Sequence, residues 1–176
     1  GIRFSDFYAA SPRCTPTRAA YFTGRSPAQL HMTFVGEGKK EGSVNPGDKV
    51  IAPDTTSELP AGIETVGTLL KKQGYATAHF GKWHVGRINP REHGFDENDG
   101  ANSNGGPENS EEPNPKQCYA TAKLGMDFMA RQVRAGKPFY LQISHYPGKT
   151  PDTALPETLE AVKQRLGTRL DMNRIG

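Results

Sequence analysis

The sequence predicts an α/β fold in which helices flank a parallel or mixed sheet. Two short apolar runs, 75–80 and 138–144, have the length and composition of strands buried in such a sheet. Each follows a stretch in which apolar residues recur at three- and four-residue steps, and a glycine separates the two, Gly74 in one case and Gly136 in the other. Helices that alternate with strands are typical of this fold class.

Three helices are expected from the spacing of apolar residues. The first begins near Leu59 and ends at Gly74, with apolar positions at 63, 66, 69 and 70. The second covers 119–135, and its predicted core face comprises Leu124, Phe128, Met129 and Val133. The third covers 156–170, with a common face formed by Leu159, Val162 and Leu166.

The segments between these helices and strands differ in character. Residues 2–9 alternate weakly and carry three aromatic side chains, which predicts a short strand leading into the loop before Cys14. Residues 36–56 are rich in Gly, Lys, Pro and Asp and indicate an exposed excursion. Residues 98–117 hold almost no apolar side chain, and a loop this long in a compact domain is typically functional or mobile.

Composition limits the classes of function. The chain of 176 residues is long enough for one domain with a core, and no apolar run reaches the length of a membrane helix. The formal charge is only +3 and the basic residues are dispersed, which argues against a nucleic-acid partner. The two cysteines lie far apart, so they form neither a disulfide framework nor a zinc knuckle.

The residues with the clearest chemistry lie at 14–18, in the pattern Cys-x-Pro-x-Arg. Pro16 suits the first turn of a helix, so Cys14 lies beside unpaired backbone N–H groups and Arg18 lies one turn further on. Such a position attracts anions and lowers the pKa of a thiol. A cysteine near a helix start is also often just a small, partly buried residue. A phosphatase-type cradle is excluded because its arginine is missing at the required spacing.

This pattern continues into Thr-Gly-Arg at 23–25, and a second motif, Gly-Lys-Trp-His-x-Gly, occupies 81–86. Together with the segments 92–96 and 137–144, in the same order, these motifs resemble the type I sulfatases of the alkaline phosphatase superfamily. The resemblance implies an alkaline-phosphatase-like sandwich with a mostly parallel or mixed central sheet. It also implies that residues 1–176 are part of a single catalytic domain, without its first strand and its C-terminal portion.

The resemblance assigns roles to four residues. Cys14 would be oxidised to formylglycine, whose hydrate attacks sulfur with one hydroxyl and expels sulfate through the other. Arg18 would hold the hydrate and compensate the anion, while the compact ammonium of Lys82 bridges nucleophile and sulfate. His84 would act as a base in the second step, because histidine is the side chain best suited to exchange protons near neutral pH.

Each of these side chains also has a structural interpretation. A lone Lys82 is most simply a solvated lysine, and a lone His84 a histidine satisfied by neighbouring groups. Within the motif both favour the functional role, since its two glycines allow close backbone approach. His79, in the middle of a strand, is expected to be structural and Cys118 an inert thiol. His31 and His93 are left as residues near the site or on the surface.

Ligands of open α/β sheets bind outside the carboxyl ends of the strands. The candidate site residues all follow a predicted strand: Cys14 follows 2–9, Lys82 and His84 follow 75–80, and His145 and Lys149 follow 138–144. We therefore expect them to line one crevice. Where many relatives have a histidine two positions before a proline, this chain has Lys149, so either Lys149 or His145 is expected to contact the sulfate.

The resemblance further implies a calcium ion, for which modified Cys14 supplies one ligand and residues outside this chain the others. It also implies a formylglycine-generating maturation enzyme as a partner and a periplasmic or secreted location. No signal segment is visible in the sequence.

The predicted function is hydrolysis of a sulfuric ester, either a sulfated carbohydrate or an aryl sulfate. One alternative is a phosphonate or phosphodiester hydrolase of the same superfamily, which shares Cys-x-Pro-x-Arg. A second is a non-catalytic protein that binds anions or glycans on a decayed sulfatase frame.

Overall fold

The computed structural model confirms an α/β fold with a parallel sheet. It describes residues 1–35, 46–47, 49, 55–105, 115–146 and 155–167. The helices are α1 (Cys14–Thr23), α2 (Val66–Lys72), α3 (Cys118–Arg134) and α4 (Pro156–Leu166), with short 3-10 turns at Pro90–His93 and Pro115–Gln117. The strands are β1 (Ala76–Gly81), β2 (Glu97–Asn98) and β3 (Phe139–Ser144).

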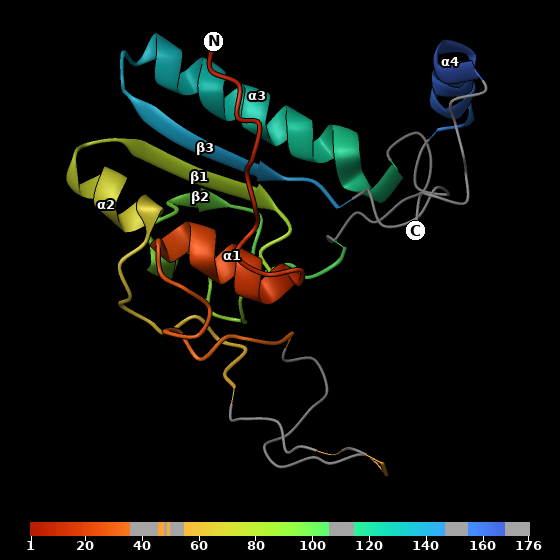
Figure 1. The fold of residues 1–176 in the computed structure, drawn as a ribbon. Helices are drawn as coiled ribbons and strands as arrows, with labels where there is room; N and C mark the ends of the chain where they lie inside the picture. Colours follow the sequence, from red (N-terminus) through yellow and green to blue (C-terminus); the bar gives the residue numbers. More distant parts are fainter. Residues whose placement is uncertain (36–45, 48, 50–54, 106–114, 147–154, 168–176) are drawn as a thin grey trace.

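The strand β1 lies at the centre of the three-stranded sheet, whose order is β2-β1-β3. Both neighbours run parallel to it, with Ala78 opposite Glu97 and Gly81 opposite Ser144. The helix α3 covers one face of the sheet, and α1 and α2 lie on the other (Figure 1). Because the strands are parallel, all three end at the same edge of the sheet, as the sequence predicts for 75–80 and 138–144.

Side chains of β1 alternate between two cores. Ala78 and Phe80 face α3, where the Phe80 ring lies 6.5 Å from that of Phe128. Thr77 and His79 point to the opposite face, and both are fully or almost fully buried. A strand covered on both faces in this way is typical of α/β proteins.

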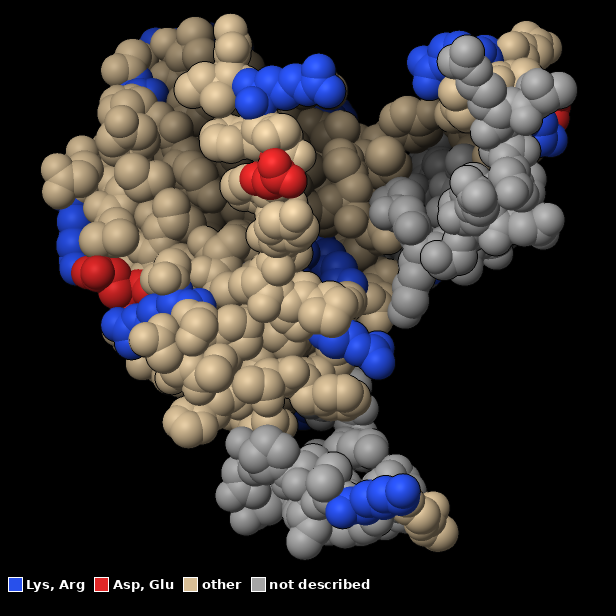
Figure 2. Space-filling model, in the orientation of Figure 1, with Lys and Arg blue, Asp and Glu red and all other residues tan. Residues whose placement is uncertain are grey.

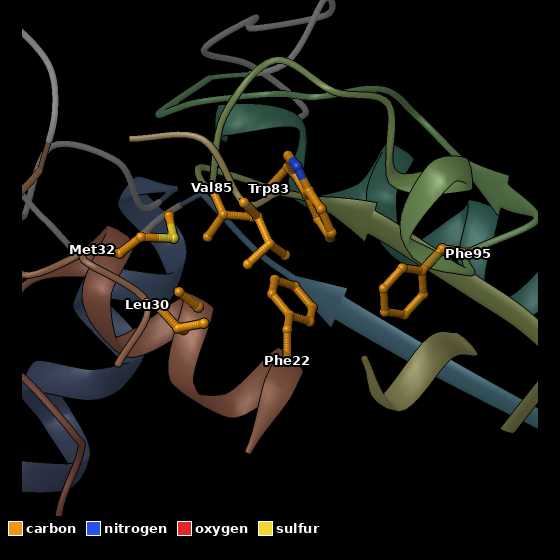
Figure 3. Packing of buried hydrophobic residues seen from close by; sticks show 8 residues of the cluster. Phe22, Leu30, Met32, Trp83, Val85 and Phe95 are labelled. Atoms are coloured by element: carbon orange, nitrogen blue, oxygen red, sulfur yellow. The ribbon is translucent and has the colours of Figure 1, made fainter. Parts of the chain in front are cut away.

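The larger core joins α1 to the loop that follows β1, residues 82–86 (Figure 3). The rings of Phe22 in α1 and Trp83 in that loop have centroids 4.6 Å apart, and Phe95 lies 5.8 Å from Trp83. The buried residues of this core are Ala19, Phe22, Leu30, Met32, Leu59, Trp83, Val85 and Phe95. Burial of each large apolar side chain stabilises the fold by about 1.5–3 kcal/mol. The loop after β1 is therefore part of the core rather than a surface excursion.

The strand predicted over 2–9 is wrong. The segment has no regular structure and bends at residues 5–6, and none of the described strands pairs with it. Its apolar side chains face outward, with Ile2 86% and Phe7 82% exposed. A weakly alternating segment does not form a strand by itself. A strand needs a neighbouring strand that pairs with its backbone N–H and C=O groups.

The predicted core face of the second helix is also wrong. The helix α3 lies where expected, but of the four predicted core residues only Phe128 is buried, and Val133 is 69% exposed. The face that meets the sheet comprises Thr121, Gly125 and Phe128. A Cβ at position 125 would lie 2.5 Å from Cδ1 of Ile143. Small residues therefore allow this helix to approach β3 closely.

The first predicted helix is shorter than its apolar spacing indicates. It begins at Val66, because Thr65 caps it: the Thr65 hydroxyl accepts from the Thr68 N–H at 3.1 Å, and the Thr68 hydroxyl accepts from the Thr65 N–H at 2.8 Å. Gly74 follows the helix with a φ of +82°, which confirms the predicted stop.

The remaining predicted elements have mixed outcomes. The third helix is present as Pro156–Leu166, but none of its residues is buried, so its predicted face belongs to neither hydrophobic core of the described residues. Most of the predicted excursion 36–56, and the centre of the loop 98–117, lie outside the described residues. Within the described part of the chain, no helix has the length and apolarity needed to cross a membrane.

The close approach at Gly81 predicts a large cost for a methyl group there. A Cβ on Gly81, whose φ is +92°, would lie 2.2 Å from the carbonyl oxygen of Ser144. Gly74 also has positive φ but has open space around it. We expect Gly81→Ala to lower the free energy of unfolding by about 3 kcal/mol or more, and Gly74→Ala by about 1 kcal/mol. Denaturant unfolding measures both, and equal costs would contradict the close contact.

Buried His79 predicts a loss of stability in acid. Burial lowers its pKa from 6.5 to about 3, and the charge of Arg18 adds to the effect. Between these two values the unfolded chain holds a proton at His79 that the folded chain does not, so stability falls as the pH falls through this window. In His79→Gln the stability should decline less steeply over this range, by up to about 1.4 kcal/mol per pH unit.

The test is denaturant unfolding of both proteins from pH 8 to pH 4. At pH 8 the imidazole is neutral in both states, so the difference there reports packing and the contact of His79 with the Ser144 hydroxyl. Identical pH slopes for His79→Gln and the unsubstituted protein would contradict the prediction.

Candidate anion site

The first turn of α1 presents Cys14, as the sequence predicts. Arg13 precedes the helix in an extended conformation, and Cys14 is its first residue and is exposed to solvent. Pro16 lies in the first turn and is buried. The Thr15 hydroxyl donates to the backbone carbonyl of His84 at 2.9 Å, and this bond joins the start of the helix to the second motif. The two motifs are therefore in direct contact.

Arg18 makes the second connection between the motifs. Its Nε donates to the backbone carbonyl of Trp83 at 2.6 Å, and its Nη2 donates to that of Lys82. The guanidinium carbon also lies 5.6 Å from the ring centroid of Tyr21. Burial lowers the pKa of Arg18, while Tyr21 and Cys14 raise it. An arginine stays charged in such surroundings, so a fixed positive charge lies one turn beyond Cys14.

The loop after β1 is held by its backbone from two sides. The Lys82 N–H donates to the carbonyl of Ser144 at 2.8 Å, at the end of β3. The N–H groups of Trp83 and His84 both donate to the carbonyl of Asn102 at 2.9 Å. His84 has a φ of +56° and is only 8% exposed. A non-glycine residue held in this region by its surroundings is a common feature of functional sites.

The Lys82 side chain leaves this loop toward a polar segment. Its Nζ donates to the Asn104 side-chain carbonyl at 2.7 Å. This bond holds a flexible side chain in one orientation, and an ammonium retains further donors for a second acceptor.

The other predicted site residues have different positions. His145 follows β3 at the same edge of the sheet, is exposed, and has its Nδ1 3.8 Å from the Cys118 sulfur. Lys149 lies outside the described residues. His79 and His93 are fully buried, whereas His31 is exposed.

The structure thus brings Cys14, Arg18, Lys82 and His84 together through hydrogen bonds between α1 and the loop after β1. The expected route was partly wrong, because Cys14 does not follow a strand. Cys14 is positioned by α1, which lies on the face of the sheet opposite α3. The catalytic roles of the four side chains remain predictions.

Sequence reasoning missed several residues that hold the site. Thr15 and Ser144 bond to the loop after β1, and so does the segment 99–104 that follows β2. Their signal in the sequence is weak, because polar residues in a glycine-rich stretch are typical of any loop. The pairing of β2 with β1, and the bonds from this stretch to the loop, show that it lies beside the site.

The described residues were compared with the ligand needs of a calcium ion. They contain no group of three or more His, Cys, Asp or Glu side chains that could hold a metal ion. A hard cation needs about six oxygen ligands, and Cys14 could supply one after oxidation.

The face of the molecule in Figure 2 carries Lys and Arg side chains at scattered positions, interrupted by Asp and Glu. No continuous basic stripe of the kind that binds nucleic acid crosses the described part of this face.

Comparisons with known proteins identify the family. The sulfatase family model matches residues 1–165, and the chain therefore belongs to the sulfatase family. N-acetylgalactosamine-6-sulfatase of Sus scrofa is 40% identical over 101 residues, which cover 55% of this chain and 18% of that protein. Human arylsulfatase A is 40% identical over 86 residues, covering 49% of this chain and 14% of that protein.

A longer match is the N-acetylgalactosamine-6-sulfatase of Canis lupus familiaris, 30% identical over 175 residues that cover 80% of this chain and 31% of that protein. The crystal structure of Ps i-CgsB superposes with a TM-score of 0.62 at 22% identity, covering 88% of this chain and 39% of that one. This likeness shows the fold. The chain thus spans less than a third of the length of these curated relatives.

The two bonds of Arg18 predict a structural cost for its removal. In Arg18→Ala the carbonyls of Lys82 and Trp83 lose their charged donor, and we expect the free energy of unfolding to fall by about 2 to 4 kcal/mol. Arg25, exposed just beyond α1, is the matched control, and Arg25→Ala should change stability by less than about 0.5 kcal/mol. Thermal and denaturant unfolding measure both. Similar effects of the two variants would contradict the bracing role of Arg18.

Proposed function

We propose that the protein carrying this chain hydrolyses sulfate esters at a site centred on Cys14. The observation that supports the proposal most strongly is the direct connection of the Cys14 helix to the loop of Lys82 and His84, through Arg18 and Thr15. The two motifs are separated by more than sixty residues in the sequence, and each is expected to bind an oxyanion. These hydrogen bonds hold them in contact. Membership of the sulfatase family agrees with this assignment.

The four residues divide the work of the reaction. Cys14 is the precursor of formylglycine, whose hydrated aldehyde supplies a nucleophilic oxygen and a way to release sulfate. The helix start and Arg18 compensate negative charge on the sulfuryl oxygens, in a fixed arrangement that needs no reorganisation during the reaction. Lys82 donates to the sulfate from a side chain whose direction is set by Asn104. His84 hydrogen-bonds the hydrate and acts as the base in the second step, in which sulfate is expelled.

The leaving group needs a proton donor or a hydrogen bond on the far side of the sulfur. His145 is at the carboxyl end of β3, on the edge of the sheet where β1 delivers Lys82. We assign the contact with the sulfate on this side to His145 or Lys149.

A sulfated carbohydrate is the proposed substrate class. The relatives from Sus scrofa and Canis lupus familiaris are named N-acetylgalactosamine-6-sulfatase, and Ps i-CgsB has a structure in complex with k-i-k-neocarrahexaose. Beside the site, the segment 98–104 is rich in amide side chains, which suit the hydroxyl groups of a sugar. Human arylsulfatase A, also similar, makes an aryl sulfate the second choice.

The proposal includes a formylglycine-generating maturation enzyme, a calcium ion and a periplasmic or secreted location. All three derive from the family resemblance. The calcium ligands other than Cys14 would come from outside residues 1–176.

The oxidation state of Cys14 tests the enzymatic function. In the full-length protein co-expressed with a maturation enzyme, mass spectrometry of the peptide around Cys14 should show the aldehyde. Cys14→Ala should lower the turnover of an aryl sulfate by about 10³-fold or more. Val133→Ala, at an exposed position near the end of α3, should leave turnover within about twofold, as for a substitution away from the reacting atoms.

Two outcomes would contradict the proposal. A thiol that persists at Cys14 despite co-expression would favour a non-catalytic protein that binds anions or glycans. Faster turnover of a matched phosphodiester than of the aryl sulfate would favour a phosphodiester hydrolase.

A further inference from the structure

The carboxylate of Asp99 lies against the point where β1 turns into the Lys82 loop. Both of its oxygens are 2.9 Å from the backbone N of Gly81, the last residue of β1. Asp99 comes directly after β2, the strand that pairs with β1. The side chain thus continues the pairing of these two strands by one further hydrogen-bonded position.

Gly81 is fixed on its other side by β3. It has a φ of +92° and so close an approach to the carbonyl of Ser144 that no Cβ fits between them. The next residue, Lys82, donates its N–H to that same carbonyl at 2.8 Å. The hydrogen bond to Asp99 on one side and the close contact with Ser144 on the other therefore set the direction in which the chain leaves β1.

The residues after Asp99 hold the rest of the loop. The Asn102 side-chain nitrogen donates to the backbone carbonyl of Asp99 at 2.9 Å. The backbone carbonyl of Asn102 accepts from Trp83 and His84. Asp99 therefore acts twice on the loop, once through its carboxylate on Gly81 and once through its backbone on Asn102.

Stability alone does not explain a carboxylate at this position. Burial raises the pKa of Asp99, and the hydrogen bond from Gly81 only partly opposes this. None of the ion pairs formed among the described residues includes Asp99. A half-buried charge without a cationic partner costs free energy, and groups of this kind concentrate at functional sites.

We propose that Asp99 is a positioning residue for the sulfatase reaction. By holding the Gly81 N–H it fixes the backbone from which the Lys82 and His84 side chains extend, while Asn104 holds the end of the Lys82 side chain. This inference rests on the proposed function, because Lys82 and His84 act on the sulfate only there.

The test uses the full-length protein with three substitutions. Asp99→Ala removes the acceptor, Asp99→Asn keeps one acceptor oxygen in the same place, and Asp96→Ala is the control. Asp96 directly precedes β2, at the end of the strand opposite Asp99, and forms an ion pair with Lys71 at the surface. Displacement of a reacting group by about 1 Å costs about 10²-fold in rate, so Asp99→Ala should lower kcat by about that factor with KM within about threefold.

The conservative variant separates positioning from charge. Asp99→Asn should restore kcat to within about tenfold of the unsubstituted protein, because one charge-free hydrogen bond remains. Asp96→Ala should leave kcat unchanged. Equal loss in Asp99→Ala and Asp99→Asn, or equal loss in Asp96→Ala, would overturn the proposal.

Amide hydrogen exchange gives a readout independent of activity. In Asp99→Ala the peptide 76–85, which contains Gly81, should exchange faster by about tenfold or more, and in Asp99→Asn it should stay protected. Unchanged exchange in Asp99→Ala overturns the positioning role, whatever the activity. Faster exchange in a protein whose unsubstituted form cleaves no sulfate ester leaves the positioning role standing and refutes the proposed function.

Should Asp99→Ala not fold, Asp99→Glu replaces it. The longer side chain keeps the charge but moves the carboxylate by one methylene, so kcat should fall by about tenfold or more below that of Asp99→Asn. Activity in Asp99→Glu equal to or above that in Asp99→Asn would overturn the proposal.

Discussion

The bonds of the Arg18 guanidinium to the carbonyls of Lys82 and Trp83 are the interaction on which the rest of the site depends. Without them, α1 would contact the loop after β1 mainly through apolar packing and the single bond from Thr15. Apolar packing has no preferred direction, so it brings a helix and a loop together without fixing their relative orientation. A planar guanidinium bonded to two successive carbonyls does fix it. The start of α1 is thereby held against the backbone of the second motif.

The loop after β1 is rigid for a related reason. Its backbone bonds to β3 through Ser144 and to the segment after β2 through Asn102, while Trp83 fills the core under the sheet. Function and stability therefore share the same residues: the backbone atoms of Lys82 and His84 belong to the framework, and their side chains belong to the proposed site. Such preorganisation is what stabilisation of developing charge requires, since groups that are already oriented cost no reorganisation during the reaction.

Predictions from the sequence were correct where local chemistry decides the structure. The start of α1 at Cys14, the strand β1, the strand β3 and the stop at Gly74 follow from a proline, from short apolar runs and from a glycine with positive φ. Predictions were wrong where the structure of a segment depends on the element that packs against it. The segment 2–9 has no strand beside it among the described residues, and α3 meets the sheet through Gly125 rather than Met129. A pattern of apolar residues shows which side chains avoid water, but not how closely two backbones approach.

By itself, the sequence determined the fold class, the two motifs and the family, because each depends on residue types at short spacings. Only the tertiary structure decided that Arg18 braces the second motif through its backbone, and that Asp99 and Asn102 hold the same loop. These contacts join residues separated by 18 to 65 positions, and their partners are mostly backbone atoms. Every residue carries the same backbone groups, so no residue type in the sequence marks them. Their pairing becomes visible only when strands and helix are placed in space.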